Sequence, residues 1–139
     1  MLLPGNILLS SENEDEKLTP VLIDFGLATR SEKLSTHQAT VGNVRTNLYS
    51  PETSEEEIKF PGSRDVYSWG IIAVECLSQE LVMTYADLVR VFEDEIEPNF
   101  PNSITNILGN CISLRAKNRP KDVKKLSKLL QVANAKLRP

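Results

Sequence analysis

The sequence predicts a mainly α-helical domain with one small β-hairpin near its N-terminus. From residue 63 onward, apolar residues recur at the spacing of a helix face in four successive stretches. Before residue 24, two short apolar runs, residues 7–9 and 21–23, flank a polar acidic stretch, which is typical of two strands joined by a loop. Because two strands alone do not form a stable sheet, the helices must supply the core.

The second strand runs into Asp24, Phe25 and Gly26. Gly26 allows a sharp change of backbone direction, and a carboxylate at a strand end suits Mg²⁺, which favours hard oxygen ligands and nucleotide phosphates. The simpler interpretation is a strand followed by a turn. Residues 26–49 show no clean periodicity and are interpreted either as a mobile segment or as a plain polar surface loop.

A central helix is predicted over residues 64–79, with Ser63 as its cap. Its apolar residues lie on several sides, which predicts burial all round and, in particular, burial of Trp69 and Val74. We expect the hairpin to pack on this helix, because two strands need a further element to cover their apolar side chains.

Three further helices are expected after the central one. The first begins at Thr84, where Thr84 and Asp87 can form a capping box, and it ends before Pro98. The next covers residues 104–112. The last covers residues 123–137 and carries many lysines on its solvent side.

The composition is that of a globular protein, with 40% hydrophobic and 25% charged residues in a chain of 139, enough for one domain. The net charge of −3 gives no reason to expect nucleic acid or a membrane surface as a partner, and no apolar run reaches the length of a membrane span. Cys76 and Cys111 fall on apolar helical stretches. They are interpreted as small core residues in a reducing compartment, so a cytoplasmic location is expected.

Five stretches, in order along the chain, resemble signatures of the protein kinase family. They are Leu2-Leu3-Pro4-Gly5-Asn6 at the end of the catalytic loop, Asp24-Phe25-Gly26, Tyr49-Ser50-Pro51-Glu52 at the end of the activation segment, Asp65-Val66-Tyr67-Ser68-Trp69-Gly70 at the start of the central helix, and Asn118-Arg119-Pro120 before the last helix. The resemblance covers nearly the whole chain, but only the lower half of a kinase.

The resemblance implies a protein-kinase-like C-terminal lobe with the N-lobe absent, as a single partial domain over residues 1–139. Its parts would be the catalytic-loop end at 1–9, the metal-binding and activation segment at 24–52, and the helical core at 63–137. ATP and Mg²⁺ are the cofactors that the resemblance implies, with Asp24 binding the Mg²⁺ that bridges the phosphates and Asn6 holding the second Mg²⁺ position. The alternative for Asn6 is a simple turn residue.

The resemblance also implies three structural residues. Glu52 and Arg119 would form a buried ion pair that ties the activation segment to the helical core, because a guanidinium can bind a carboxylate with two parallel hydrogen bonds. Asp65 would anchor the backbone of the catalytic loop from the central helix. The alternative for these residues is a solvated surface charge.

The chain departs from the family's catalytic-loop pattern at two positions. Met1 stands where the family has its catalytic Asp, and Leu3 stands where it has the lysine that contacts the transferred phosphate. No residue is therefore assigned a catalytic role. The family's glycine-rich loop and strand lysine are also absent from the sequence. The presence of Thr46 favours specificity for Ser and Thr over specificity for Tyr.

The sequence therefore predicts a partial protein kinase domain, from a family that phosphorylates Ser and Thr of proteins with ATP and Mg²⁺, that is itself inactive. The alternative is a pseudokinase or kinase-like protein-interaction module, which the internal change at Leu3 favours; an unrelated helical domain is the third interpretation. Expected partners are a protein substrate or a partner chain, with a missing N-lobe as one candidate, since its absence would leave an apolar patch near residues 7–9. Residues encoded upstream of Met1 would discriminate best between the first two interpretations.

Overall fold

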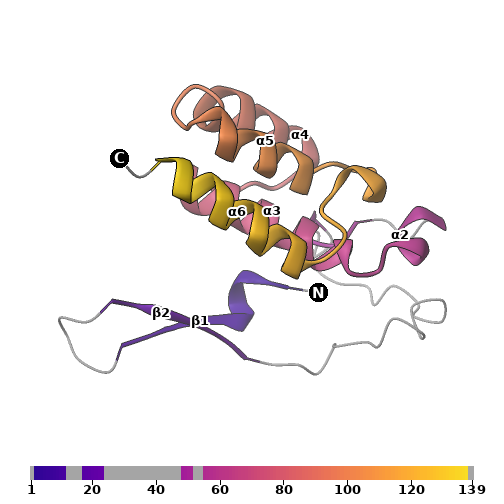
Figure 1. Ribbon diagram of the computed structural model, residues 1–139, viewed down its shortest axis with the longest axis horizontal. Helices are drawn as coiled ribbons and strands as arrows, with labels where there is room; N and C mark the ends of the chain where they lie inside the picture. The colour runs from indigo at the N-terminus through magenta and orange to yellow at the C-terminus, as the bar shows by residue number, and fades with distance from the viewer. Residues whose placement is uncertain (1, 12–16, 24–47, 52–54, 138–139) are drawn as a thin grey trace.

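The computed structural model describes residues 2–11, 17–23, 48–51 and 55–137, and it confirms a mainly helical fold with one two-stranded antiparallel sheet (Figure 1). The elements are η1 (Pro4–Asn6), β1 (Ile7–Ser10), β2 (Thr19–Leu22), α2 (Glu55–Lys59), α3 (Ser63–Ser78), α4 (Tyr85–Val91), the π-helical turn η3 (Phe92–Ile96), α5 (Asn102–Cys111), η4 (Ala116–Asn118) and α6 (Val123–Leu137). Within the described ranges, no helix has both the length and the apolarity to cross a bilayer.

Strands β1 and β2 form the predicted hairpin, with Ile7 opposite Leu22 and Ser10 opposite Thr19. The expected packing of this hairpin on the central helix is wrong. Apart from Ile7, every strand residue is exposed, and Leu9 keeps 64% of its surface in solvent. In Figure 1 the hairpin lies beside the helices instead of between them. The elements that pack on α3 are instead α4, η3, α5 and α6.

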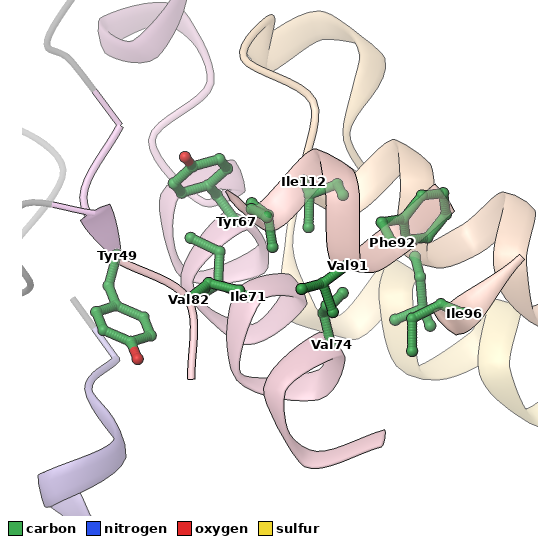
Figure 2. Packing of buried hydrophobic residues seen from close by; sticks show 11 residues of the cluster. Tyr49, Tyr67, Ile71, Val74, Val82, Val91, Phe92, Ile96 and Ile112 are labelled. Carbon is green, nitrogen blue, oxygen red and sulfur yellow. The ribbon is translucent and has the colours of Figure 1, made fainter. Parts of the chain in front are cut away.

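Helix α3 is the centre of the helical part, and α4, η3, α5 and α6 pack around it. Figure 2 shows the main apolar cluster at this junction. Its buried members are Tyr49, Tyr67, Ile71, Val74, Val82, Leu88, Val91, Phe92, Ile96, Leu108 and Ile112. Each fully buried aliphatic side chain in such a cluster contributes about 1.5–3 kcal/mol. A smaller cluster of Val66, Cys111 and Leu126 joins α3, α5 and α6.

The all-round burial predicted for α3 is only partly observed. Val74 is fully buried, as expected, whereas Trp69 is only half-buried and packs at the edges of both apolar clusters. Leu77 and Cys76 are exposed, so the interpretation of Cys76 as a core residue is wrong. Cys111 is buried as expected. In this last turn Cys76 and Leu77 face solvent, whereas Glu75 beside them is buried.

The close approach of α3 and α5 depends on Gly70. A Cβ atom at this position would lie 2.8 Å from Cβ of Cys111 and 3.0 Å from Cγ2 of Ile112. Real Cβ atoms do not approach so closely, so only glycine lets the two helices meet at this point.

The capping signals are partly confirmed. Thr84 and Asp87 form the predicted capping box, in which the Asp87 N–H donates to Oγ1 of Thr84 and the Thr84 N–H donates to Oδ2 of Asp87, both at 3.1 Å. Ser63 does not cap α3, contrary to the prediction. It is the first helical residue, and its hydroxyl donates to the backbone oxygen of Phe60 at 2.7 Å.

Candidate functional site

The N-terminal turn holds Asn6 beside the end of the second strand. The Asn6 N–H donates to the backbone oxygen of Leu3 at 3.0 Å, and the Asn6 backbone oxygen accepts from the Ile23 N–H at 2.8 Å. The second bond extends the ladder by one residue beyond the pairing of Ile7 with Leu22. Asn6 is therefore fixed opposite the residue that directly precedes Asp24 in the sequence.

Asp24 lies outside the described residues, as do Met1, Glu52 and nearly all of the segment 26–49. The cofactor and metal site predicted from Asn6 and Asp24 is thus described at Asn6 alone. The donor chemistry fits Mg²⁺, because an amide oxygen and a carboxylate leave coordination positions for water and phosphate oxygens. In the described part of the chain, no group of three or more His, Cys, Asp or Glu side chains lies together in a way that could hold a metal ion.

Leu3 packs against the main apolar cluster from the N-terminal turn, and it is half-buried. This is the position where the resemblance would place a lysine that contacts phosphate. An ammonium group at this place would have to leave water to occupy the same contacts, which is costly for a charge. The leucine therefore serves packing, and the site has no cation at this position.

Tyr49, the last residue of the segment 26–49, is joined to α3 through Glu75. The Tyr49 hydroxyl donates to Oε2 of Glu75 at 2.6 Å, and Oε1 of the same carboxylate accepts from the Val82 N–H at 3.1 Å. Tyr49 and Glu75 are both buried. One carboxylate thus joins the loop segment, α3 and the connection that leads to α4.

Two more residues of α3 bind the same stretch. The Ser68 hydroxyl donates to the Tyr49 backbone oxygen at 2.7 Å, and Nη2 of Arg64 donates to Oγ of Ser50 at 3.1 Å. Arg64, Ser68 and Glu75 follow one another by four and seven residues, so they share one face of the helix. Nη1 of Arg64 is buried and has no hydrogen-bond partner among the described residues.

Arg119 is buried, with 5% of its surface exposed, so the solvated-charge alternative is excluded for it. Its guanidinium donates to three backbone oxygens, those of Ser113 at 2.7 Å, Leu114 at 3.1 Å and Ser63 at 3.4 Å. The same group lies 4.7 Å from the ring centre of Tyr67. Arg119 therefore joins the start of α3 to the loop before α6, while its predicted pairing with Glu52 remains a prediction.

Asp65 lies in the first turn of α3, where a carboxylate interacts favourably with the helix dipole, and its side chain is exposed. Its predicted contact with the backbone of the catalytic-loop stretch also remains a prediction.

Burial changes the acid–base behaviour of two side chains near Arg119. Desolvation raises the pKa of Cys111 to about 12, although the positive charge of Arg119 acts in the opposite direction. Desolvation likewise raises the pKa of Tyr85 against the effect of Arg119. Both groups are therefore held in their neutral forms, and neither is suited to act as a nucleophile.

Glu75 is a buried residue of the site that the sequence patterns did not predict. The available signal was an acidic residue inside the otherwise apolar stretch Ile71-Ile72-Ala73-Val74-Glu75-Cys76-Leu77. A carboxylate at such a place needs hydrogen-bond donors, because an unpaired buried charge is unfavourable. Taken together, the described side chains can hold a backbone segment on α3 and offer one amide ligand at Asn6, and they present no base or nucleophile beside it.

The chain matches the family model described as protein tyrosine and serine/threonine kinase over residues 2–130. No solved structure matches it significantly.

Three relatives illustrate the similarity to curated proteins. The chain is 26% identical over 141 residues to a Drosophila melanogaster protein named as mitogen-activated protein kinase kinase kinase 7-like, covering 91% of this chain and 33% of the relative. It is 26% identical over 143 residues to the Mus musculus interleukin-1 receptor-associated kinase 3, covering 84% and 24%. It is 31% identical over 132 residues to the Dictyostelium discoideum probable serine/threonine-protein kinase samkA, covering 88% and 19%. The chain thus spans a third or less of the length of these relatives.

Proposed function

The chain belongs to the protein tyrosine and serine/threonine kinase family, and on this basis we propose that it is a partial kinase domain that does not itself transfer phosphate. The observation that carries the proposal is the apolar packing of Leu3 against the core. Phosphoryl transfer depends on positioning and on electrostatic stabilisation of the transferred group. A leucine at the position of the phosphate-contacting lysine supplies no such stabilisation.

The proton of the substrate hydroxyl also has no acceptor in the expected place. Met1 occupies the position that corresponds to the catalytic carboxylate, and a thioether is no base at neutral pH. The family activity, ATP-dependent phosphorylation of protein Ser or Thr, is therefore assigned to the family and not to this chain.

Asn6 and Asp24 are the proposed ligands of Mg²⁺ in a complex with ATP. The ion would neutralise charge on the nucleotide phosphates. The bond between the Asn6 backbone oxygen and the Ile23 N–H supports this assignment, because it fixes Asn6 next to the chain position before Asp24. Binding is expected to be weak, since Mg²⁺ gives up its waters reluctantly and this chain contributes two ligands.

The exposed hairpin supports a second polypeptide as a partner. Its exposed apolar side chains are Leu8, Leu9, Leu18, Val21, Leu22 and Ile23. An apolar surface of this kind is typical of a protein–protein contact, and an N-lobe or a partner chain is the proposed occupant. The free thiols of Cys76 and Cys111 are consistent with the proposed cytoplasmic location.

The second candidate function is a pseudokinase or kinase-like interaction module. The exposed hairpin favours it specifically, because such a module needs a binding surface and no chemistry. The two candidates share the prediction of inactivity and differ in nucleotide binding, which a module of this second kind does not require.

The test is an assay of the purified chain with γ-labelled ATP, Mg²⁺ and a generic protein substrate. We expect no label transfer above background from the chain or from Asp24→Ala. Transfer by the chain that is lost in Asp24→Ala and kept in the surface variant Asp94→Ala would overturn the proposal. The longest reading frame that contains the chain is assayed in parallel, because transfer by that protein would favour an active kinase.

A fluorescent ATP analogue then separates the two candidates. The partial kinase domain predicts binding that requires Mg²⁺ and weakens in both Asn6→Ala and Asp24→Ala. Binding that is absent in the chain favours the interaction module, and binding that ignores both substitutions shows that the metal ligands are assigned wrongly.

A further inference from the structure

Charge is strongly segregated along this chain. Residues 115–139 contain nine Lys or Arg and one acidic residue, Asp122, for a net charge of +8. Residues 1–114 contain seven basic and eighteen acidic residues, for a net charge of −11, and the two parts together give the −3 of the whole chain. The small net charge of the whole chain therefore conceals a strongly basic C-terminal part.

Helix α6 presents much of this charge on one side. Lys125, Lys128, Val132 and Lys136 follow one another by three and four residues, so they lie in one stripe along the helix. All four side chains are exposed, whereas Leu126 and Ala133 of the same helix are buried. The stripe is thus displaced from the side that packs on the core.

An open cleft of about 510 Å³ lies where this stripe begins, between the end of α5, η4 and α6. Its walls include basic, amide and apolar side chains, namely Asn110, Asn118, Arg119, Lys121, Lys125 and Leu129. Arg119 forms a fixed wall, because three backbone oxygens hold its guanidinium. The single acidic residue of the region, Asp122, accepts from the Lys125 N–H at 2.7 Å and so lies at the start of α6.

We propose that this basic surface, the cleft together with the stripe Lys125, Lys128 and Lys136, binds an acidic segment of a partner protein. A side-chain carboxylate of the partner occupies the cleft between Lys121 and Lys125. The following residues of the segment lie along α6, which is about 22 Å long at 1.5 Å per residue. The amides of Asn110 and Asn118 can bind the peptide backbone of the partner, and Leu129 offers an apolar contact.

A protein segment fits better than nucleic acid or a membrane. Single-stranded nucleic acid is bound through aromatic side chains as well as cations, and neither α6 nor the cleft wall contains an aromatic residue. An extended polyanion would also meet the rest of the chain, which carries −11. A short acidic segment avoids this repulsion, because charges beyond about 8 Å are largely screened at physiological ionic strength.

The test measures binding of a fluorescent Asp/Glu-rich peptide of about twelve residues to the full chain by anisotropy; twelve extended residues reach about 40 Å, enough to span the cleft and α6. The probe control is the same peptide with Asn and Gln in place of Asp and Glu. We expect binding of the acidic peptide only, and a clear loss of affinity when the salt concentration is raised, as for any binding through exposed charges.

Charge-reversal variants then locate the site. Lys125→Glu with Lys128→Glu is expected to weaken binding at least about tenfold, which is 1.4 kcal/mol. The control with the same change in net charge, Lys17→Glu with Arg90→Glu, alters exposed basic residues in the hairpin loop and in α4, and it is expected to change affinity less than about threefold. Lys124→Glu is the local control, because Lys124 lies about 100° around the axis of α6 from Lys125 and so outside the stripe. Circular dichroism verifies that each variant is folded.

Three outcomes would overturn the proposal. The first is no binding of the acidic peptide at millimolar concentration, and the second is equal weakening by both double variants. The third is that a single-stranded oligonucleotide or a phosphatidylserine vesicle binds more tightly than the peptide, and that this binding is lost in the Lys125→Glu/Lys128→Glu variant. That result would assign the same surface to a different class of partner.

Discussion

The hydroxyl of Tyr49 lies 2.6 Å from Oε2 of Glu75, and both side chains are buried although 26 residues separate them. The bond is short because the acceptor is a carboxylate, and hydrogen bonds to charged groups are both shorter and stronger than neutral ones. Through this bond and the one to the Val82 N–H, Glu75 couples the end of the loop segment to two other parts of the helical core.

Tyr49→Phe is expected to lower the free energy of unfolding by about 1.5–3 kcal/mol, because it removes one donor to a buried carboxylate. Urea denaturation measures the change. Tyr85→Phe is the matched control, since its hydroxyl donates to the Ile112 backbone oxygen at a long 3.4 Å, and its effect should be clearly smaller. A double-mutant cycle of Tyr49→Phe with Glu75→Gln should give a coupling energy above about 1 kcal/mol. Additive effects would contradict the coupling.

Gly70→Ala is expected to destabilise the chain by about 1–3 kcal/mol, because the new Cβ would lie 2.8 Å from Cβ of Cys111, which cannot move independently of the α5 backbone. The helix propensity of alanine alone would predict the opposite sign. Gly109→Ala is the control, since its Cβ would meet Cζ of Phe92 at 3.3 Å, the tip of a side chain. Thermal unfolding that shows equal shifts for both variants would refute this account of the helix contact.

Arg119→Ala is expected to cost about 3–5 kcal/mol if the predicted pair with Glu52 exists, the typical effect of removing one partner of a buried pair. Arg119→Lys should restore little, because an ammonium cannot reproduce the fork that binds three backbone oxygens. The melting temperature measures both effects. The pair itself is tested by a cycle with Glu52→Gln, and zero coupling there would leave Arg119 with its backbone role alone.

The two cysteines should differ in reactivity. In native conditions a thiol reagent is expected to modify the exposed Cys76 rapidly and the buried Cys111 only after unfolding. Rapid modification of both thiols in the folded chain would contradict the burial of Cys111.

Cys111 should also make the fold sensitive to alkali. Its pKa is raised from 9.0 to about 12 in the folded chain, so its contribution to stability is complete below pH 9.0 and is lost as the pH rises towards 12. The slope from this single group is at most about 1.4 kcal/mol per pH unit. Urea unfolding across this range measures it, and Cys111→Ala should have a shallower slope than the parent chain. Identical slopes would show that the thiol does not titrate differently in the two states.

The helices could be predicted from the sequence because their signals are local. The period of apolar residues gave the last helix over residues 123–137 as observed, and the Thr84–Asp87 spacing gave the capping box. The position of the hairpin could not be predicted in this way. The two apolar runs predict strands, but they do not show which elements pack on α3, and these proved to be helices and η3.

The site was predictable only where family resemblance and local chemistry agree. The sequence showed that Leu3 stands where the family has a lysine. Only the structure showed that this leucine packs against the core. Trp69 was expected in the interior because the helix is apolar on several sides, but a large ring at the edge of two clusters remains half in solvent. Glu75 was missed because no periodic pattern marks a buried acid.

The hydrogen bond between Nη1 of Arg119 and the backbone oxygen of Ser63 spans 56 residues. During synthesis, Ser63 is therefore made well before the side chain that binds it. At about 5–20 residues per second, a ribosome needs on the order of 3–11 s to add the residues between the two ends. During that interval the first turn of α3 exists without the guanidinium that later bridges it to the loop before α6. A chain released before residue 119 would therefore lack this bridge between the start of α3 and the loop before α6.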